Sequence, residues 1–165
     1  MGARTFALIF VALLVSGVLG LSYSVQVFPL RLTDGDKTEI IKLTLERAIV
    51  AKEIPDYHII EDKENIVLST ENIDPDLVSR ISGVNLTLLD PDKIQEKADR
   101  EGDFLFLRFK QIQINGSRVI VSLDNTWAVS KNSQVGYLSG GGFTIGYNRD
   151  LFGRWVGEII VWWIS

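Results

Sequence analysis

Apolar and polar side chains alternate over long stretches in the last third of the chain, which predicts a twisted antiparallel sheet. After Phe109 the apolar register moves by one position, so a β-bulge is expected near Lys110. Asn115-Gly116 separates two strand patterns and predicts a tight hairpin with positive φ at both central residues. The terminal segment 155–164 is apolar on both faces, and we therefore expect it to lie inside the sheet.

Three consecutive glycines, Gly140 to Gly142, interrupt the third long strand. A phosphate-binding loop would need a following Lys-Ser/Thr pair or a helix start, and neither occurs here. We expect these glycines to let a long strand bend sharply or bulge.

The part of the chain that precedes the predicted sheet has apolar residues at helical spacing. One apolar stripe, typical of an amphipathic helix that lies on a sheet, is formed by Ile40, Ile41, Leu45, Ala48 and Ile49. Asp36, followed three residues later by Glu39, resembles a capping box at the start of this helix.

Two short strands, 64–70 and 84–89, and two further helix starts follow. Each helix start places Asp before Pro, at Asp74-Pro75 and Asp90-Pro91, which suits an N-cap followed by the first helical position. The second of these helices should end near residues 101–102. Helices followed by long antiparallel strands predict the α+β class.

The N-terminus has the layout of a signal peptide or membrane anchor over residues 1–24. One basic residue, Arg4, precedes an apolar run from Phe6 to Leu21, which is shorter than the roughly 20 residues of a usual spanning helix. We expect export with cleavage, and a single domain over residues 25–165 that is secreted or periplasmic. The alternative is a retained anchor, with the membrane as partner through residues 5–21.

Composition narrows the chemistry further. The chain has no cysteine, so its stability cannot come from a disulfide. Without the leader it carries 16 basic and 21 acidic residues, a net charge of −5 that argues against nucleic acid as partner. The single histidine, His58, lies in a polar connection, and no segment has a complete calcium-loop or zinc pattern. We therefore expect no catalytic residue, no metal and no cofactor.

A pocket is predicted where polar and aromatic groups come close together on a central strand. Asp124, Asn125 and Trp127 combine a carboxylate, an amide and an indole, and a concave sheet face can supply both core and cavity. Tyr137 and Tyr147 are added as ligand-binding candidates from the neighbouring strand region. The ligand is an unidentified small molecule or protein.

A leading amphipathic helix, smaller elements and then long strands ending in Gly-Arg-Trp-Val-Gly-Glu-Ile-Ile-Val-Trp at 153–162 resemble the nuclear-transport-factor-2-like (cystatin-like) α+β group. The resemblance covers roughly residues 34–165. It implies a bent antiparallel sheet of about four long strands wrapped on the N-terminal amphipathic helix, with short inserted helices. That group contains isomerases and dehydratases as well as non-catalytic binders, so the resemblance leaves the activity open.

Three hypotheses of function follow. The first is a non-catalytic extracytoplasmic module that binds a ligand or a protein. The second is a small acid/base enzyme that uses Asp124, aided by Tyr137 or Tyr147, in a hydrophobic cone. The third is an anchored accessory subunit of a membrane complex. A homodimer through the sheet face would cover the apolar surface of the terminal strand.

Overall fold

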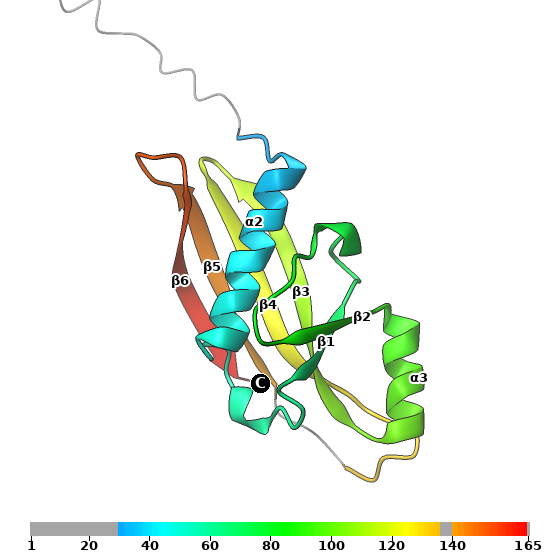
Figure 1. Ribbon diagram of the computed structural model, residues 1–165. Coiled ribbons are helices and arrows are strands. Elements are labelled where there is room, and N and C mark those ends of the chain that lie inside the picture. Colours follow the sequence, from blue (N-terminus) through cyan, green and yellow to red (C-terminus); the bar gives the residue numbers. More distant parts are fainter. Residues whose placement is uncertain (1–29, 136–139, 165) are drawn as a thin grey trace, which may run out of the picture.

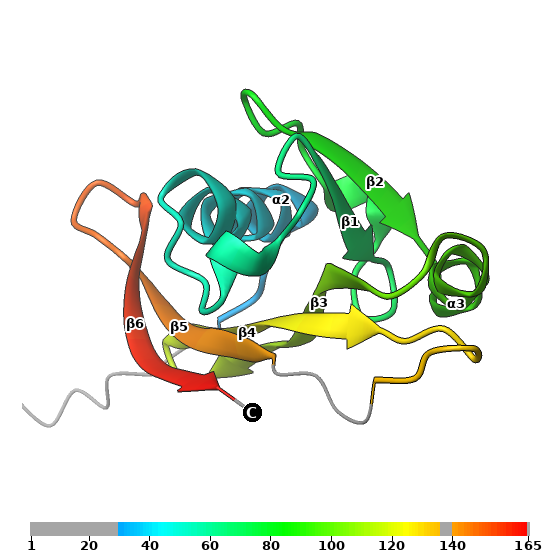
Figure 2. The same cartoon turned by 90° about the horizontal axis from the view of Figure 1, so that it is seen from below.

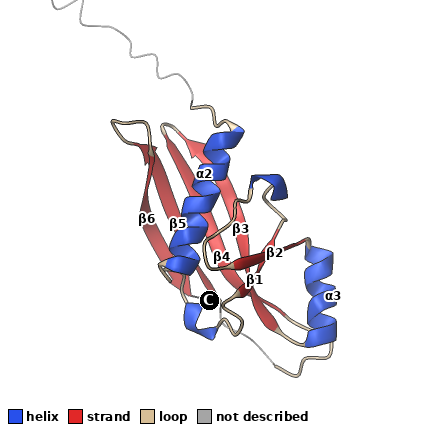
Figure 3. Ribbon diagram, viewed as in Figure 1, coloured by secondary structure: helices blue, strands red, loops and turns tan. Residues whose placement is uncertain are grey.

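Within the residues that the structure describes, six strands form one mixed sheet, and two α-helices pack against it (Figures 1 and 3). The computed structural model describes residues 30–135 and 140–164, so the predicted leader, residues 1–24, lies outside the described residues. The strands are β1 (Asn65–Ser69), β2 (Asn85–Leu89), β3 (Phe104–Asn115), β4 (Arg118–Ala128), β5 (Gly141–Arg149) and β6 (Trp155–Ile164). The α+β class predicted from the sequence is confirmed.

The strand order is β2-β1-β3-β4-β5-β6. Strands β3 to β6 pair antiparallel, whereas β1 runs parallel to both of its neighbours. The sheet therefore differs from the expected antiparallel sheet of about four strands, because the two short strands join it. Parallel pairing requires a crossover connection, and the helix between β2 and β3 is one such connection.

Helix α2 (Asp34–Leu45), continued by a π-helical turn at Glu46–Val50, lies across one face of the sheet. Its capping box differs from the predicted one. Thr33 is the N-cap: its Oγ1 accepts a hydrogen bond from the Asp36 backbone N–H at 3.1 Å, and Asp36 Oδ2 accepts one from the Thr33 N–H at 3.0 Å. The helix thus begins earlier than the Asp36/Glu39 pair suggested.

The core lies between α2 and the sheet. All five residues of the predicted helical stripe are buried there, together with alternate residues of the strands, among them Leu107, Phe109, Leu123, Phe143 and Tyr147. The second helix, α3 (Pro91–Glu101), packs on a separate cluster that includes Val67, Phe104 and Phe106. Because these residues alternate with core residues along β1 and β3, α3 covers the reverse face of that part of the sheet (Figure 2).

The β3–β4 hairpin confirms the predicted bulge, because the strand register shifts between Phe109 and Gln111. The predicted turn geometry is wrong. The two loop residues are Gly116 and Ser117, and only Gly116 has a positive φ, of 62°. A glycine at the first central position with positive φ there alone is the type II′ arrangement.

Strand β6 is an edge strand, so the expectation that it lies inside the sheet is wrong. A second bulge falls at Ile160, because Ile145 pairs with Ile159 while Thr144 pairs with Val161. Five β6 side chains are about half exposed or more: Val156, Ile160, Val161, Trp162 and Ile164. Apolar side chains on both faces of a strand indicate that both faces are covered by other groups. The sequence pattern does not show whether those groups belong to this chain or to another molecule.

The glycines at the start of β5 allow a close approach of neighbouring groups. A Cβ atom on Gly142 would overlap the indole of Trp163 and lie 2.5 Å from the carbonyl oxygen of Leu123. A Cβ atom on Gly141 would lie 2.7 Å from Pro55. These glycines thus make room for Trp163 on one face and for Pro55 on the other. Among residues 30–135 and 140–164, no helix is both long and apolar enough to cross a membrane.

Candidate functional site

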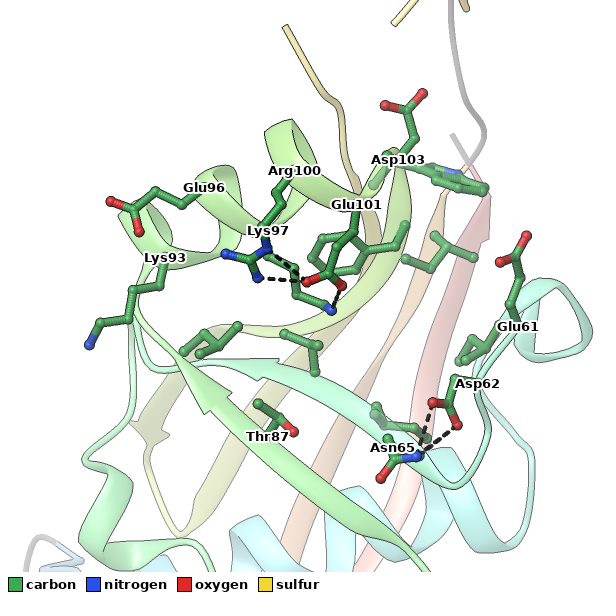
Figure 4. Close-up of a pocket in the computed structure, with 18 of the residues that line it drawn as sticks. Glu61, Asp62, Asn65, Thr87, Lys93, Glu96, Lys97, Arg100, Glu101 and Asp103 are labelled. Atoms are coloured by element: carbon green, nitrogen blue, oxygen red, sulfur yellow. Dashed lines mark hydrogen bonds and ion pairs between the residues drawn. The ribbon is translucent and has the colours of Figure 1, made fainter. Parts of the chain in front are cut away.

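A pocket of about 650 Å³ lies between α3, strands β1 and β2, the segment 59–65 and the start of β3 (Figure 4). Its apolar lining consists of Ile59, Ile60, Ile66, Val67, Leu89, Phe104, Leu105 and Trp127. Its charged lining consists of Glu61, Asp62, Lys93, Glu96, Lys97, Arg100, Glu101 and Asp103. The pocket is therefore amphipathic.

Helix α3 brings the basic groups to the mouth of the pocket. The helix begins as its sequence predicts, with Asp90 Oδ1 accepting a hydrogen bond from the Lys93 N–H at 2.9 Å and Pro91 in the first position. Ile94 and Ala98 are buried against the sheet. Residues 93, 97 and 100 lie at helical spacing on another face, so packing of the apolar face directs them to the pocket.

Glu101 forms ion pairs with two basic side chains at the mouth of the pocket. Lys97 and Arg100 both donate to its carboxylate, the latter from Nη2 at 2.6 Å, and these hydrogen bonds hold the pKa of Glu101 below its ordinary value. Lys97 Nζ also lies 5.3 Å from the centre of the Phe104 ring. Cationic and apolar groups are thus adjacent in the pocket.

The opposite wall is fixed by Asp62. Its carboxylate accepts hydrogen bonds from Asn65 Nδ2 at 3.0 Å and from the Asn65 backbone N–H at 2.9 Å, which lower the pKa of Asp62 (Figure 4). These bonds attach Asp62, in the segment that precedes β1, to Asn65, the first residue of β1.

Asp99 joins α3 to the loop that follows β4. Its Oδ1 accepts a hydrogen bond from the Lys131 N–H at 2.8 Å, and its Oδ2 lies 2.8 Å from Lys131 Nζ. Chiefly through Lys131, and also through Gln95, the pKa of Asp99 falls to about 2. The C-terminal half of the helix that carries Lys97 and Arg100 is therefore attached to the loop after β4.

Of the predicted site residues, Trp127 lines this pocket. Asp124 lies on the sheet face opposite α2, where its Oδ2 is 3.2 Å from Arg108 Nη2 and 3.5 Å from Lys110 Nζ. Asn125 lies on the α2 face, and its Nδ2 donates to the carbonyl oxygen of Pro55 at 3.2 Å. Neighbouring residues of a strand point to opposite faces, so Asp124 and Asn125 do not converge.

Tyr147 is buried in the core under α2. Its hydroxyl lies 2.8 Å from Thr44 Oγ1, which donates its own proton to the Ile40 carbonyl oxygen, so Tyr147 is the donor in this pair. Burial raises the pKa of Tyr147 to about 12. Tyr137 lies outside the described residues. The four predicted residues that the structure describes, Asp124, Asn125, Trp127 and Tyr147, therefore do not form one site.

The sequence pattern did not predict that residues of α3 and β2 would line a pocket. The sequence predicts the α3 helix and its basic residues, but the direction in which they point depends on the parallel pairing of β1 with β2 and β3. His58 is exposed on a 3₁₀ turn. Within the described ranges, no three His, Asp or Glu side chains gather in a group that could hold a metal ion.

Comparisons with protein-family models, curated proteins and solved structures found no match to this chain.

Proposed function

We propose that this protein is a non-catalytic, extracytoplasmic binding module whose ligand is a small amphipathic anion. The observation that carries the proposal is the pocket beside α3, where an apolar floor meets Lys97 and Arg100. A volume of about 650 Å³ lies within the range of small-molecule sites, and such sites combine apolar walls with a few polar groups.

The apolar body of the ligand would cover the floor of the pocket. Burial of apolar surface stabilises a complex by roughly 25 cal/mol per Å² before the cost of association. The anionic head would compete with Glu101 for Lys97 and Arg100, because these two cations already hold one carboxylate. A planar guanidinium is well suited to a second oxyanion.

The packing under α2 favours a binding module over an acid/base enzyme. Such an enzyme would need an open cone with a carboxylate in it, yet the space under α2 is filled by buried Phe109, Phe143 and Tyr147. Asp124 is on the other face and is paired with Arg108 and Lys110. The enzyme hypothesis gains no support from these positions.

Pocket filling tests the proposal. Thr87 lines the pocket and is exposed, so Thr87→Trp should fill the cavity with little effect on folding. With 8-anilinonaphthalene-1-sulfonate as the anionic probe, fluorescence titration should show binding to the parent protein and its loss in Thr87→Trp. The matched control is Gln113→Trp, on an exposed β3 position away from the pocket, which should bind as the parent does. Equal binding by both variants would contradict the proposal.

The variant Glu101→Gln distinguishes binding of the ligand's anionic group by Lys97 and Arg100 from binding of its apolar part alone. This variant removes the internal carboxylate competitor and leaves Lys97 and Arg100 in place, so the affinity for the anionic probe should rise. A neutral analogue without the sulfonate should show no such gain. Weaker anion binding in Glu101→Gln would overturn the assignment of these cations to a ligand.

A second candidate function is self-association through β6. The strand presents an unpaired edge and five exposed apolar side chains, while its one charged side chain is Glu158. Exposed apolar edges are sites for pairing with another strand. Two copies of β6 paired antiparallel about a two-fold axis near Ile160 would place Glu158 opposite Trp162, without like charges facing each other.

Sedimentation analysis distinguishes this candidate from a monomer. The parent should sediment as a dimer, and Val161→Lys should sediment as a monomer because a lysine on an edge strand opposes pairing. Ile114→Lys is the matched control, since Ile114 is similarly exposed, 44% against 47%, but lies on β3, which β4 and β5 separate from β6. A dimer that persists in Val161→Lys would exclude β6 as the interface.

A further inference from the structure

The turn between β5 and β6 presents two apolar side chains to solvent. Leu151 is 101% exposed and Phe152 is 82% exposed. Tight turns usually carry Gly, Asn, Asp, Ser or Pro, because those residues satisfy the turn backbone or its special φ values. Adjacent Leu and Phe at such a tip contribute nothing to the core of this chain.

Four of the five backbone N–H groups of this turn, those of Asp150, Phe152, Gly153 and Arg154, donate hydrogen bonds within it. The N–H groups of Phe152 and Arg154 donate to Asp150 Oδ1, each at 2.9 Å, and the Gly153 N–H donates to the Asp150 carbonyl oxygen at 3.0 Å. The Asp150 N–H donates to the Arg154 carbonyl oxygen at 2.9 Å, and Arg149 Nη1 donates to that of Gly153 at 2.7 Å. These internal bonds reduce the backbone desolvation that would oppose entry of the turn into an apolar medium.

Asp36 fixes this turn beside the start of α2. Its Oδ1 accepts from Trp155 Nε1 at 3.0 Å and pairs with Arg149, so it contacts the residues on both sides of the turn. The described chain begins at Leu30, close to the same end of the molecule (Figure 1). The apolar run 6–21 precedes Leu30 by residues 22–29, which span at most roughly 30 Å when fully extended.

We propose that Leu151 and Phe152 insert into the interface of a lipid bilayer. The inference rests on the retained-anchor alternative: residues 6–21, if held in a bilayer, would keep the first turn of α2 near the lipid surface, and the turn 150–154 lies at that end (Figure 1). Amphipathic elements bind this interface by burying apolar side chains at the boundary between headgroups and acyl chains, with basic residues at headgroup level. Arg154, whose guanidinium carbon lies 5.3 Å from the centre of the Phe152 ring, pairs with Asp150 but stays largely exposed, and it is placed for that role.

Site-directed spin labelling tests this inference, because the chain has no cysteine and one can be introduced at a chosen place. The full chain carrying Phe152→Cys with a nitroxide is reconstituted into vesicles of equal parts phosphatidylcholine and phosphatidylglycerol. The accessibility of the label to a water-soluble nickel chelate should fall several-fold on reconstitution, while its accessibility to oxygen rises. Asn132→Cys, in the loop at the other end of β5, is the control and should stay accessible to the chelate.

Two outcomes would overturn the inference. One is chelate accessibility at position 152 equal to that at 132 in vesicles, which would place the tip in water. The other is equal protection of position 152 in the lipid-free protein, which would assign the tip to contact between copies. Circular dichroism of both labelled proteins checks that the fold is retained, as expected for exposed positions.

Discussion

Asp36 shows how one side chain can combine several structural roles. It completes the capping box with Thr33, pairs with Arg149 and accepts the indole N–H of Trp155 while itself buried. Burial alone would raise the pKa of Asp36, but the hydrogen bonds from Thr33 and Trp155 and the charge of Arg149 together lower it. The ionised carboxylate therefore joins α2 to both strands of the β5–β6 hairpin.

Asp36→Ala should destabilise the protein by about 2 to 4 kcal/mol, because it removes a cap and leaves the buried Trp155 N–H without a partner. Asp36→Asn should cost less, since an amide oxygen can still accept one hydrogen bond. Asp34→Ala is the control on the same helical turn: its ion pair with Lys37 is exposed and should contribute less than about 1 kcal/mol. Urea unfolding measures all three; an Asp36→Ala variant no less stable than Asp34→Ala would contradict this role.

Local elements of this fold could be predicted well from the sequence. The α2 stripe, the Asp90-Pro91 helix start and the bulge after Phe109 each depend on neighbouring residues, and the structure confirms them. The parallel pairing of β1 and the edge position of β6 depend on contacts between distant residues, so the local pattern does not encode them. The prediction that Asp124 and Asn125 share one pocket failed for a different reason, because the local alternation of a strand already separates adjacent side chains.

The β3–β4 turn gives the sharpest test at the scale of an element. Gly116→Val should destabilise by about 1 kcal/mol or more, because a β-branched side chain is forced to a positive φ. Ser117→Val, at the other loop position with negative φ, should change stability by less than about 0.5 kcal/mol. Thermal unfolding of the pair measures the difference. Equal effects would mean that the turn does not depend on the conformation of Gly116.

At the scale of the whole molecule, stability should fall in acid partly through Asp99. Its folded pKa of about 2 lies below the ordinary 3.8, so between about pH 4 and 2 the unfolded chain binds more protons at this group. The stabilisation is therefore present above pH 3.8 and lost as the pH falls towards 2. The stability gap between the parent and Asp99→Asn, measured by urea unfolding, should narrow over that range. Lys131→Ala, which keeps the backbone N–H donor, should remove only part of the dependence.

At the scale of the whole molecule, the packed core and the pocket lie in neighbouring parts of one fold. The space under α2 is filled with apolar side chains, whereas a pocket stays open beside α3 (Figure 4), and Ile60, Ile66 and Leu105 belong both to the core cluster and to the pocket lining. In our proposal the space under α2 supplies stability and the pocket supplies binding. The resemblance to the nuclear-transport-factor-2-like group remains a prediction.

The indole N–H signals of the four tryptophans test the binding proposal most directly, because Trp127 lines the pocket while Trp155 lies in the core and Trp162 and Trp163 lie on β6. In a ¹H–¹⁵N spectrum titrated with 8-anilinonaphthalene-1-sulfonate, the proposal predicts saturable shifts of the Trp127 signal and of the backbone signals of residues 87–101, with the Trp155 signal unchanged. Shifts confined to Trp155 and α2, or to the β6 tryptophans, would contradict a ligand site beside α3.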